Sequence, residues 1–229
     1  MTTASDKSRT VFLFDVDNTL LDNDRVAADL KRHLQSRVGD GSAQRYWEIF
    51  EALRGELGYA DYLGALQRYR VERPHDSKLL EVSYFMVNYP FANRLFPESI
   101  DAVEYAKRLG RAAILSDGDV VFQPRKVDRS GLYEYFEGNV LIYVHKEEEL
   151  HDVETKYPAD HYVMVDDKVR ILAALKKHWG KRVTTIFPRQ GHYAMDAKQI
   201  AQYTRPDITL DRIGELTRYS LEEILKAAE

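Results

Sequence analysis

Two acidic residues end an apolar run near the start of the sequence. The segment TVFLFDVDNTL, residues 10–20, leads from Val11–Phe14 into Asp15 and Asp17, with Thr19 close behind. Two carboxylates this close repel each other unless a cation or a proton lowers their charge. A carboxylate can attack phosphorus, and a second acid can donate a proton to the leaving oxygen and later accept one from water. The pair therefore has the residue types that phosphoryl transfer needs.

Other polar side chains follow later apolar runs. Ser116 is the first residue of SDGD, and Lys146 is the second residue of HKEEE. Asp166 and Asp167 form an adjacent acidic pair. Clustered carboxylates suit Mg²⁺, which binds a few carboxylate oxygens together with water and substrate phosphate. A hydroxyl and an ammonium group suit the oxygens of a phosphoryl group. If the runs are neighbouring strands, these groups converge on one site.

The elements that would position these side chains can be read from the pattern of apolar residues. The short, largely apolar runs are Val11–Phe14, Ala112–Leu115, Val140–Val144, Tyr162–Val165 and Val183–Phe187. Runs of this kind predict strands covered on both faces. Helix-period segments at 97–109 and 168–179 separate some of them, and a helix or helix pair closes the chain at 213–228. We therefore expect an α/β fold with a doubly wound parallel sheet, whose strands place ligands at their carboxyl ends.

One connection is too long for this pattern. Nearly a hundred residues separate the first run from the second, whereas a strand–helix–strand unit takes roughly 30 residues in all. Much of the excess has helical spacing, with apolar residues near 30–38, 46–53, 62–69 and 79–87. We expect an inserted helical domain at 22–95 and a core made of 1–21 and 96–229.

Composition excludes several classes of function. The 229 residues carry a net charge of −4, include no cysteine and contain no apolar run of membrane-spanning length. The polar start of the chain lacks the apolar core of a signal peptide. We expect a cytoplasmic monomer or homodimer that binds neither nucleic acid nor membrane.

The motifs together resemble those of a known family. DVDNT, Ser116, Lys146 and the VDD pair occur in the order found in the haloacid dehalogenase (HAD) superfamily of phosphatases and phosphotransferases. The resemblance covers essentially the whole chain and includes the long insert, where many members carry a helical cap. It implies a Rossmann-like core, Mg²⁺ as cofactor and a small phosphorylated metabolite as substrate.

The resemblance also implies roles for individual residues. Asp15 would be the nucleophile, and Asp17 the general acid and base, protonated at the start of the cycle. Ser116 and Lys146 would bind the transferred phosphoryl group, and Thr19 would hold the loop in shape.

The expected metal ligands are Asp166, the Asp15 carboxylate and the Asp17 main-chain carbonyl. Asp167 would bind the metal or a water next to it. Lys126 and Lys168 remain alternatives to the phosphate-binding lysine named above. Asn18 stands where the family more often has glycine.

The resemblance favours a phosphohydrolase that works through an aspartyl-phosphate. A phosphomutase shares every motif and stays open as an alternative. The 2-haloacid dehalogenases lack the second acid of the first motif, so Asp17 argues against that branch. A signalling receiver domain combines a similar set of groups, but receivers are shorter and lack the insert.

Overall fold

A parallel sheet forms the centre of the computed structural model, which describes residues 9–229. Its strand order is β3-β2-β1-β4-β5-β6 and every neighbouring pair is parallel. The strands are β1 (Thr10–Phe14), β2 (Arg111–Asp117), β3 (Val140–Tyr143), β4 (His161–Val165), β5 (Val183–Pro188) and β6 (Ile208–Leu210). The order places β1 between β2 and β4, so the segments that follow these strands lie next to one another at the carboxyl edge. The polar start of the chain lies largely outside the described residues.

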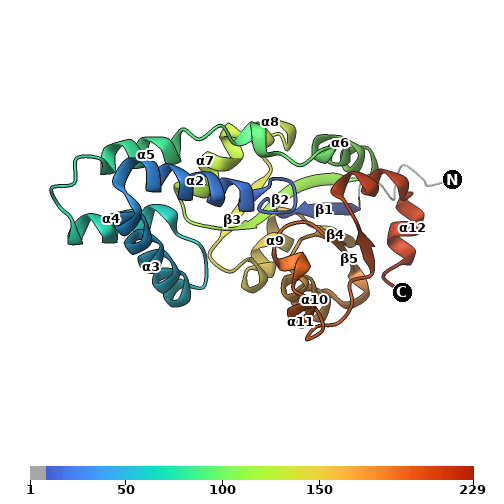
Figure 1. Ribbon diagram of the computed structural model, residues 1–229. Coiled ribbons are helices and arrows are strands. Elements are labelled where there is room, and N and C mark those ends of the chain that lie inside the picture. The colour runs from blue at the N-terminus through green and yellow to red at the C-terminus, as the bar shows by residue number, and fades with distance from the viewer. Residues whose placement is uncertain (1–8) are drawn as a thin grey trace.

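Helices cover both faces of the sheet (Figure 1). Alternation along β1 sends Phe12 and Phe14 into one apolar cluster and Val11 and Leu13 into the other. The first cluster includes residues of α6 (Ser99–Leu109), α7 (Phe122–Arg129), α8 (Leu132–Tyr135), η5 (Ile213–Arg218) and α12 (Leu221–Lys226). The second includes residues of α9 (Leu150–Lys156), α10 (Val169–Trp179), η4 (Tyr193–Met195) and α11 (Ala197–Ile200). The chain therefore folds as an α/β protein with a doubly wound parallel sheet, as predicted.

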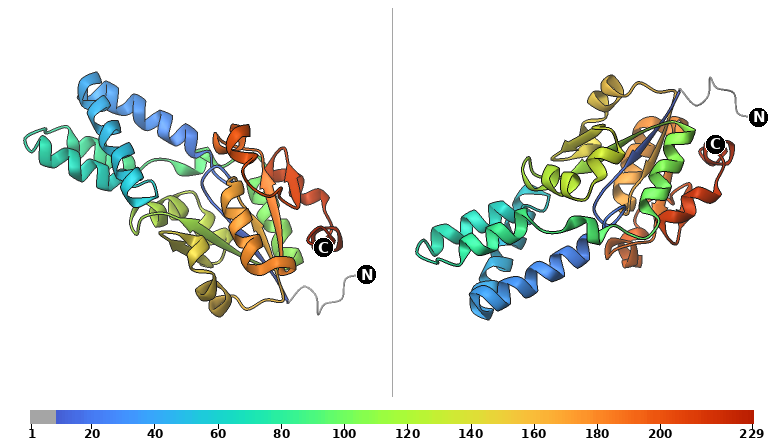
Figure 2. Two further views of the ribbon diagram at one scale, coloured as in Figure 1. Left: turned by 90° about the horizontal axis from the view of Figure 1, so that it is seen from below. Right: turned by 90° about the horizontal axis from the view of Figure 1, so that it is seen from above.

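Four α-helices precede α6 in the long connection between β1 and β2 and make up most of it. They are α2 (Asn23–Val38), α3 (Asp40–Leu57), α4 (Tyr62–Glu72) and α5 (Leu79–Val87), and the short η1 (Phe91–Arg94) follows them. These helices gather beyond one end of the sheet, away from the C-terminus (Figures 1 and 2). Asp22 and Asp61 cap α2 and α4, because each side chain accepts a hydrogen bond from a backbone N–H in the first turn. The helical spacing read from 30–87 corresponds to these helices.

The remaining short elements complete the chain. They are η2 (Lys146–Glu148) and η3 (Gly180–Arg182). The closing segment forms a pair, η5 and α12, and a capping box at Ser220 and Glu223 starts the second of them. No helix within residues 9–229 is both long and apolar enough to cross a bilayer.

Candidate active site

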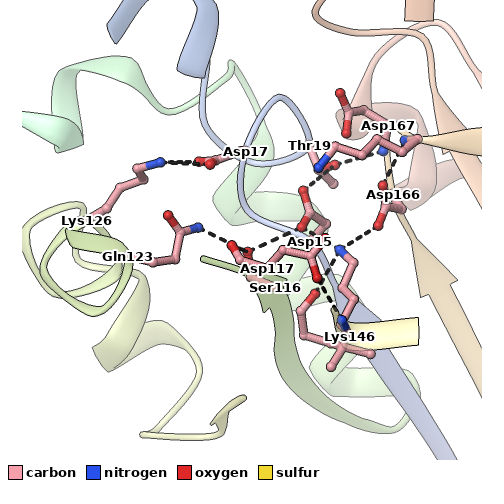
Figure 3. Close-up of polar contacts among 12 residues, drawn as sticks. Asp15, Asp17, Thr19, Ser116, Asp117, Gln123, Lys126, Lys146, Asp166 and Asp167 are labelled. Atoms are coloured by element: carbon pink, nitrogen blue, oxygen red, sulfur yellow. Dashed lines mark hydrogen bonds and ion pairs between the residues drawn. The ribbon is translucent and has the colours of Figure 1, made fainter. Parts of the chain in front are cut away.

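The first acidic residue lies at the centre of the site. Asp15 follows β1 directly and is buried, with 1% of its surface exposed. Lys146 Nζ lies 2.6 Å from Asp15 Oδ1, and Ser116 Oγ donates to the same oxygen at 3.3 Å. Thr19 Oγ1 donates to the other carboxylate oxygen at 3.4 Å. Three predicted site residues from separate segments thus converge on one carboxylate (Figure 3).

The charge on Asp15 is stabilised by lysines. Burial alone would raise the pKa of Asp15, but the positive charges of Lys146 and Lys168 outweigh burial and hold the pKa below its ordinary value. Burial would lower the pKa of Lys146, and the carboxylates of Asp15 and Asp166 raise it instead. The two lysines therefore favour the ionised form of Asp15.

The loop after β1 turns back on itself at Asn18. This residue has φ +59°, a left-handed conformation that asparagine tolerates better than most residues other than glycine. Asn18 Oδ1 accepts hydrogen bonds from the backbone N–H groups of Asn23 and Asp24, at the start of α2. Asparagine thus permits the turn and also orients the first helix of the insert.

A second group of acids follows β4. Lys146 Nζ also lies 2.6 Å from Asp166 Oδ2, and the N–H of Asp167 donates to Thr19 Oγ1 at 3.0 Å. Oxygen atoms of Asp15, Asp166 and Asp167 all lie within 4.8 Å of one another. Burial raises the pKa of Asp166 to about 6, and burial likewise raises the pKa of Asp167 well above its ordinary value.

This acidic cluster fits a hard divalent cation. Among the described residues, neither carboxylate oxygen of Asp167 has a hydrogen-bond partner, although the side chain is buried. A buried carboxylate without partners is unfavourable unless a proton or a cation compensates for it. Three converging carboxylates are also the oxygen ligands that Mg²⁺ prefers.

The second acid of the opening motif lies apart from this cluster. Both oxygens of Asp17 accept hydrogen bonds from Lys126 Nζ, at 2.6 and 2.8 Å. Lys126 belongs to α7, is 1% exposed, and also donates to Asn23 Oδ1 at 3.0 Å. The sequence analysis considered Lys126 only as an alternative phosphate ligand, whereas the structure places its ammonium group against Asp17. The protonation of Asp17 at the start of the cycle stays a prediction.

Two further residues position the site and were not anticipated. Gln123 Nε2 donates to Ser116 Oγ at 3.0 Å from the same helix as Lys126. Gln190 Nε2 donates to the backbone carbonyl of Thr19 at 3.0 Å, and its Oε1 accepts from the N–H of Ile213. Phe122, Gln123 and Lys126 all face inward from α7. A lysine four residues after a phenylalanine, on the apolar face of a helix, is the sequence signal that could have identified this role.

Three further residues take positions around the site. Asp117 Oδ1 accepts from the N–H of Lys146 at 2.8 Å, so it fixes the loop that carries the lysine. His192 Nδ1 lies 2.6 Å from Asp24 Oδ1 and connects the loop after β5 to the start of α2. Lys168 Nζ lies over the ring of Tyr193, 5.5 Å from its centroid.

A cavity of about 440 Å³ opens beside these groups, between the sheet edge and the insert. Its wall includes Asp17, Lys126 and Lys168 from the sheet side, and Arg54 and Tyr62 from α3 and α4. Arg54 donates across the cavity to the hydroxyl of Tyr193, so the two sides are in direct contact. The volume suits a small-molecule ligand.

The fold and the site define a class: an α/β protein with a buried, lysine-paired carboxylate at the end of its first strand. The family model for haloacid dehalogenase-like hydrolases matches residues 10–178. The chain belongs to this family and is a HAD-like hydrolase.

Several solved structures are similar to this chain. A protein of Burkholderia xenovorans LB400, described as a haloacid dehalogenase-like hydrolase, is 59% identical, with a TM-score of 0.89 over 93% of this chain and 99% of that one. L-2-haloacid dehalogenase of Xanthobacter autotrophicus is 19% identical, with a TM-score of 0.59 over 92% and 97%. The HAD hydrolase YfnB of Bacillus subtilis is 16% identical, with a TM-score of 0.63 over 93% and 98%. The last two show the fold alone. A comparison with curated proteins gave no match.

Proposed function

We propose that this protein is a Mg²⁺-dependent phosphohydrolase that removes the phosphoryl group of a small metabolite through an aspartyl-phosphate on Asp15. The observation that carries the proposal is the pairing of two acids with two buried lysines: Asp15 with Lys146, and Asp17 with Lys126. An ionised nucleophile beside a second carboxylate is what two-step phosphoryl transfer requires. We propose residues 22–95 as the cap that closes the site.

The first step would form a bond between an Asp15 oxygen and phosphorus while the bond to the leaving oxygen breaks. Lys146 Nζ and Ser116 Oγ already contact Asp15 Oδ1, so they lie where they could also stabilise the negative charge of the phosphoryl oxygens. Asp17 would give a proton to the leaving oxygen. Asp17 would take up this proton from solvent before the step, since both of its oxygens accept hydrogen bonds from Lys126 in the structure.

The second step would hydrolyse the aspartyl-phosphate. Asp17, as the carboxylate, would accept a proton from water while that water attacks phosphorus, and the bond between phosphorus and Asp15 breaks. When bound, Mg²⁺ would neutralise charge on the phosphoryl oxygens, and Asp15, Asp166 and Asp167 are the residues that would hold it. The solved structure of YfnB, which shares the fold, is bound to magnesium.

The main rival is a dehalogenase, because a fold neighbour is an L-2-haloacid dehalogenase with chloropropionic acid covalently bound. That branch lacks the second acid of the first motif, and this chain has Asp17. A phosphomutase would use the same residues, and the difference would be whether water or a second hydroxyl receives the phosphoryl group. Membership in a hydrolase family argues against a signalling receiver.

Leaving-group chemistry tests the proposal. Purified protein with Mg²⁺ should hydrolyse p-nitrophenyl phosphate and should not release chloride from 2-chloropropionate. Asp17→Asn should lose activity on an alkyl phosphate by about 10²–10⁴-fold, the usual contribution of general acid–base catalysis. Nitrophenolate leaves without a proton, so this variant should still release at most one equivalent of it in a burst. Asp15→Asn should show neither burst nor turnover.

The outcomes separate the candidates. Chloride release without phosphate release would identify a dehalogenase. Full phosphatase activity in excess chelator would contradict the metal requirement. Transfer of the phosphoryl group to a second hydroxyl of a sugar phosphate, in place of its release, would identify a mutase.

A further inference from the structure

Lys126 is an unusual lysine because it is buried and has no role in the motifs of the sequence. It lies on α7, and 1% of its side chain is exposed. Its ammonium group contacts both oxygens of Asp17 and the side-chain oxygen of Asn23, all within 3.0 Å. An ammonium group has three hydrogen-bond donors, and these three contacts use all of them.

This bonding pattern separates Lys126 from the lysine that faces the nucleophile. Lys146 Nζ contacts the carboxylates of Asp15 and Asp166 at the acidic cluster. Lys126 instead holds the acid that would exchange protons with the leaving group and water, on the other side of the catalytic loop (Figure 3). With its donors occupied, it is arranged to orient a carboxylate and not to bind substrate.

The third contact connects this lysine to the insert. Asn23 is the first residue of α2, the helix with which the insert begins. Tyr62, the first residue of α4, packs against Phe122 of α7 with ring centroids 5.3 Å apart. Arg125 Nε of α7 also donates to the carbonyl of Val87, the last residue of α5, at 3.0 Å. These contacts join one helix of the core to the insert, and the same helix carries the lysine that holds Asp17.

We propose that Lys126 is a positioning residue that fixes the orientation of the Asp17 carboxylate and couples it, through Asn23, to the placement of the insert. The inference rests on the proposed phosphohydrolase function, in which Asp17 exchanges protons with the leaving group and water. Without the ammonium group, the nearby negative charge of Asp15 would favour a different orientation of Asp17. The insert would then no longer influence where the acid points.

The first experiment compares Lys126→Met with a matched control. Lys156→Met makes the same chemical change at an exposed lysine that pairs with Asp152. For an alkyl phosphate, Lys126→Met should lower kcat by about 10²-fold, in the range of lost acid–base help, with KM changed by less than about threefold. Lys126→Arg should recover part of kcat, and Lys156→Met should match the wild type. A raised KM with unchanged kcat would overturn the proposal, because it would make Lys126 a substrate-binding residue.

A double-mutant cycle with Asp17→Asn then tests whether the lysine acts through this acid. Two residues that work as one unit give non-additive effects, whereas independent residues give additive ones. Lys126→Met should therefore add little to the defect of Asp17→Asn. Additive defects would show that Lys126 acts on something other than Asp17 and would overturn the proposal.

Two further measurements test the link to the insert and the orientation of the carboxylate, and the unchanged-kcat outcome of the first does not need a stable Lys126→Met variant. Asn23→Ala keeps the charge pair and removes only the link to the insert, so it should lower kcat less than Lys126→Met; an unchanged kcat would overturn the coupling. A crystal structure of Lys126→Met should show a reoriented Asp17 carboxylate, and an unmoved carboxylate in that variant would overturn the positioning role. A wild type without phosphatase activity would instead defeat the proposed function, so the two failures are distinguishable.

Discussion

At the scale of single residues, the site works by giving each acid of the opening motif its own buried lysine. Asp15 pairs with Lys146, and Asp17 pairs with Lys126. The two pairs point in different directions, toward the acidic cluster and toward α7 respectively (Figure 3). Each carboxylate therefore has its own positive partner, which offsets the repulsion between two acids separated by a single residue.

Asp167 provides a test of the metal site that does not rely on catalysis. Its buried carboxylate has no hydrogen-bond partner among the described residues. An unsatisfied buried polar group costs about 1–3 kcal/mol of stability. Asp167→Asn replaces an unpartnered carboxyl group by an equally unpartnered amide and should therefore change the melting temperature of the metal-free protein little, while it removes a metal ligand and reduces the rise that Mg²⁺ produces in the wild type.

Differential scanning calorimetry in chelator and in excess Mg²⁺ measures both effects. Asp160→Asn is the control, because Asp160 is an exposed carboxylate at the opposite end of the same strand. Equal Mg²⁺ stabilisation of wild type and Asp167→Asn would remove Asp167 from the metal site.

His161 predicts a pH dependence of stability. Burial, with a smaller effect from the charge of Lys176, lowers the pKa of His161 to about 4 from 6.5. Between these two values the unfolded chain binds a proton that the folded protein does not, so this contribution to stability is present above pH 6.5 and is lost as the pH falls toward 4. The free energy of unfolding should decrease from about pH 7.5 to about pH 5 more in the wild type than in His161→Gln. Urea unfolding at each pH measures this free energy. Equal decreases in the two proteins would contradict the lowered pKa of His161.

The sequence predicted the residues that follow strands and missed those on helices. Asp15, Ser116 and Asp166 come directly from strand ends, where the parallel sheet brings them together. Lys126 lies in the middle of the polar stretch FQPRKVDR, where a lysine is ordinarily solvated. The packing of α7 against the catalytic loop makes it a buried partner of Asp17, and its spacing from Phe122 was the one sign of this in the sequence.

At the scale of elements, the turn after α3 brings the insert against the core. Gly58 has φ +79° and caps α3, and a Cβ atom placed on it would lie 2.7 Å from the ring of His145. The neighbouring residues Tyr59 and Ala60 line the cavity. The close approach of this turn to the segment before Lys146 requires glycine for both backbone conformation and space.

Gly58→Ala should therefore weaken closure of the site. A side chain here strains the backbone and meets His145, so we expect a higher KM and a loss of stability greater than about 1 kcal/mol. Gly55→Ala is the matched control, because Gly55 lies within α3 and a Cβ atom added to it would have open space for 4 Å around it. This variant should leave KM unchanged and stabilise the protein by about 0.5–1 kcal/mol. Steady-state kinetics measure KM, and urea unfolding measures stability. Equal KM values for the two variants would show that the turn does not control access of substrate to the cavity.

The limits of element prediction follow from local physical chemistry. The five apolar runs correspond to β1–β5, because a buried parallel strand must be apolar on both faces. The sixth strand, Ile208–Leu210, has only three residues and lies at the sheet edge, where that requirement is relaxed. The helix expected from Pro97 begins at Ser99, because Glu98 takes a left-handed conformation.

At the scale of the whole molecule, one continuous apolar cluster extends from the sheet into the insert. It includes Phe12 and Phe14 of β1 together with Leu30, Phe50 and Tyr69 of the inserted helices. Aromatic contacts continue this cluster from the core into the insert, since Phe122 packs against both Tyr62 and Phe91 with ring centroids 5.3 and 5.7 Å apart. If either region unfolded alone, apolar surface of the other would be exposed to water. This cost opposes separate unfolding of the insert and the core.

The insert and the core should therefore unfold in one cooperative transition, and the two tryptophans can test this. Trp47 lies in α3 against Phe50, and Trp179 lies in α10 stacked on Tyr162 at 4.2 Å. Each variant with one tryptophan replaced, Trp47→Phe or Trp179→Phe, leaves a fluorophore in one region only. Within each variant, the urea midpoint from fluorescence should coincide with the midpoint from far-UV circular dichroism, which is the signature of two-state unfolding. A lower fluorescence midpoint in Trp179→Phe, where only Trp47 reports, would mean that the insert unfolds first and that the shared cluster is too weak to couple it to the core.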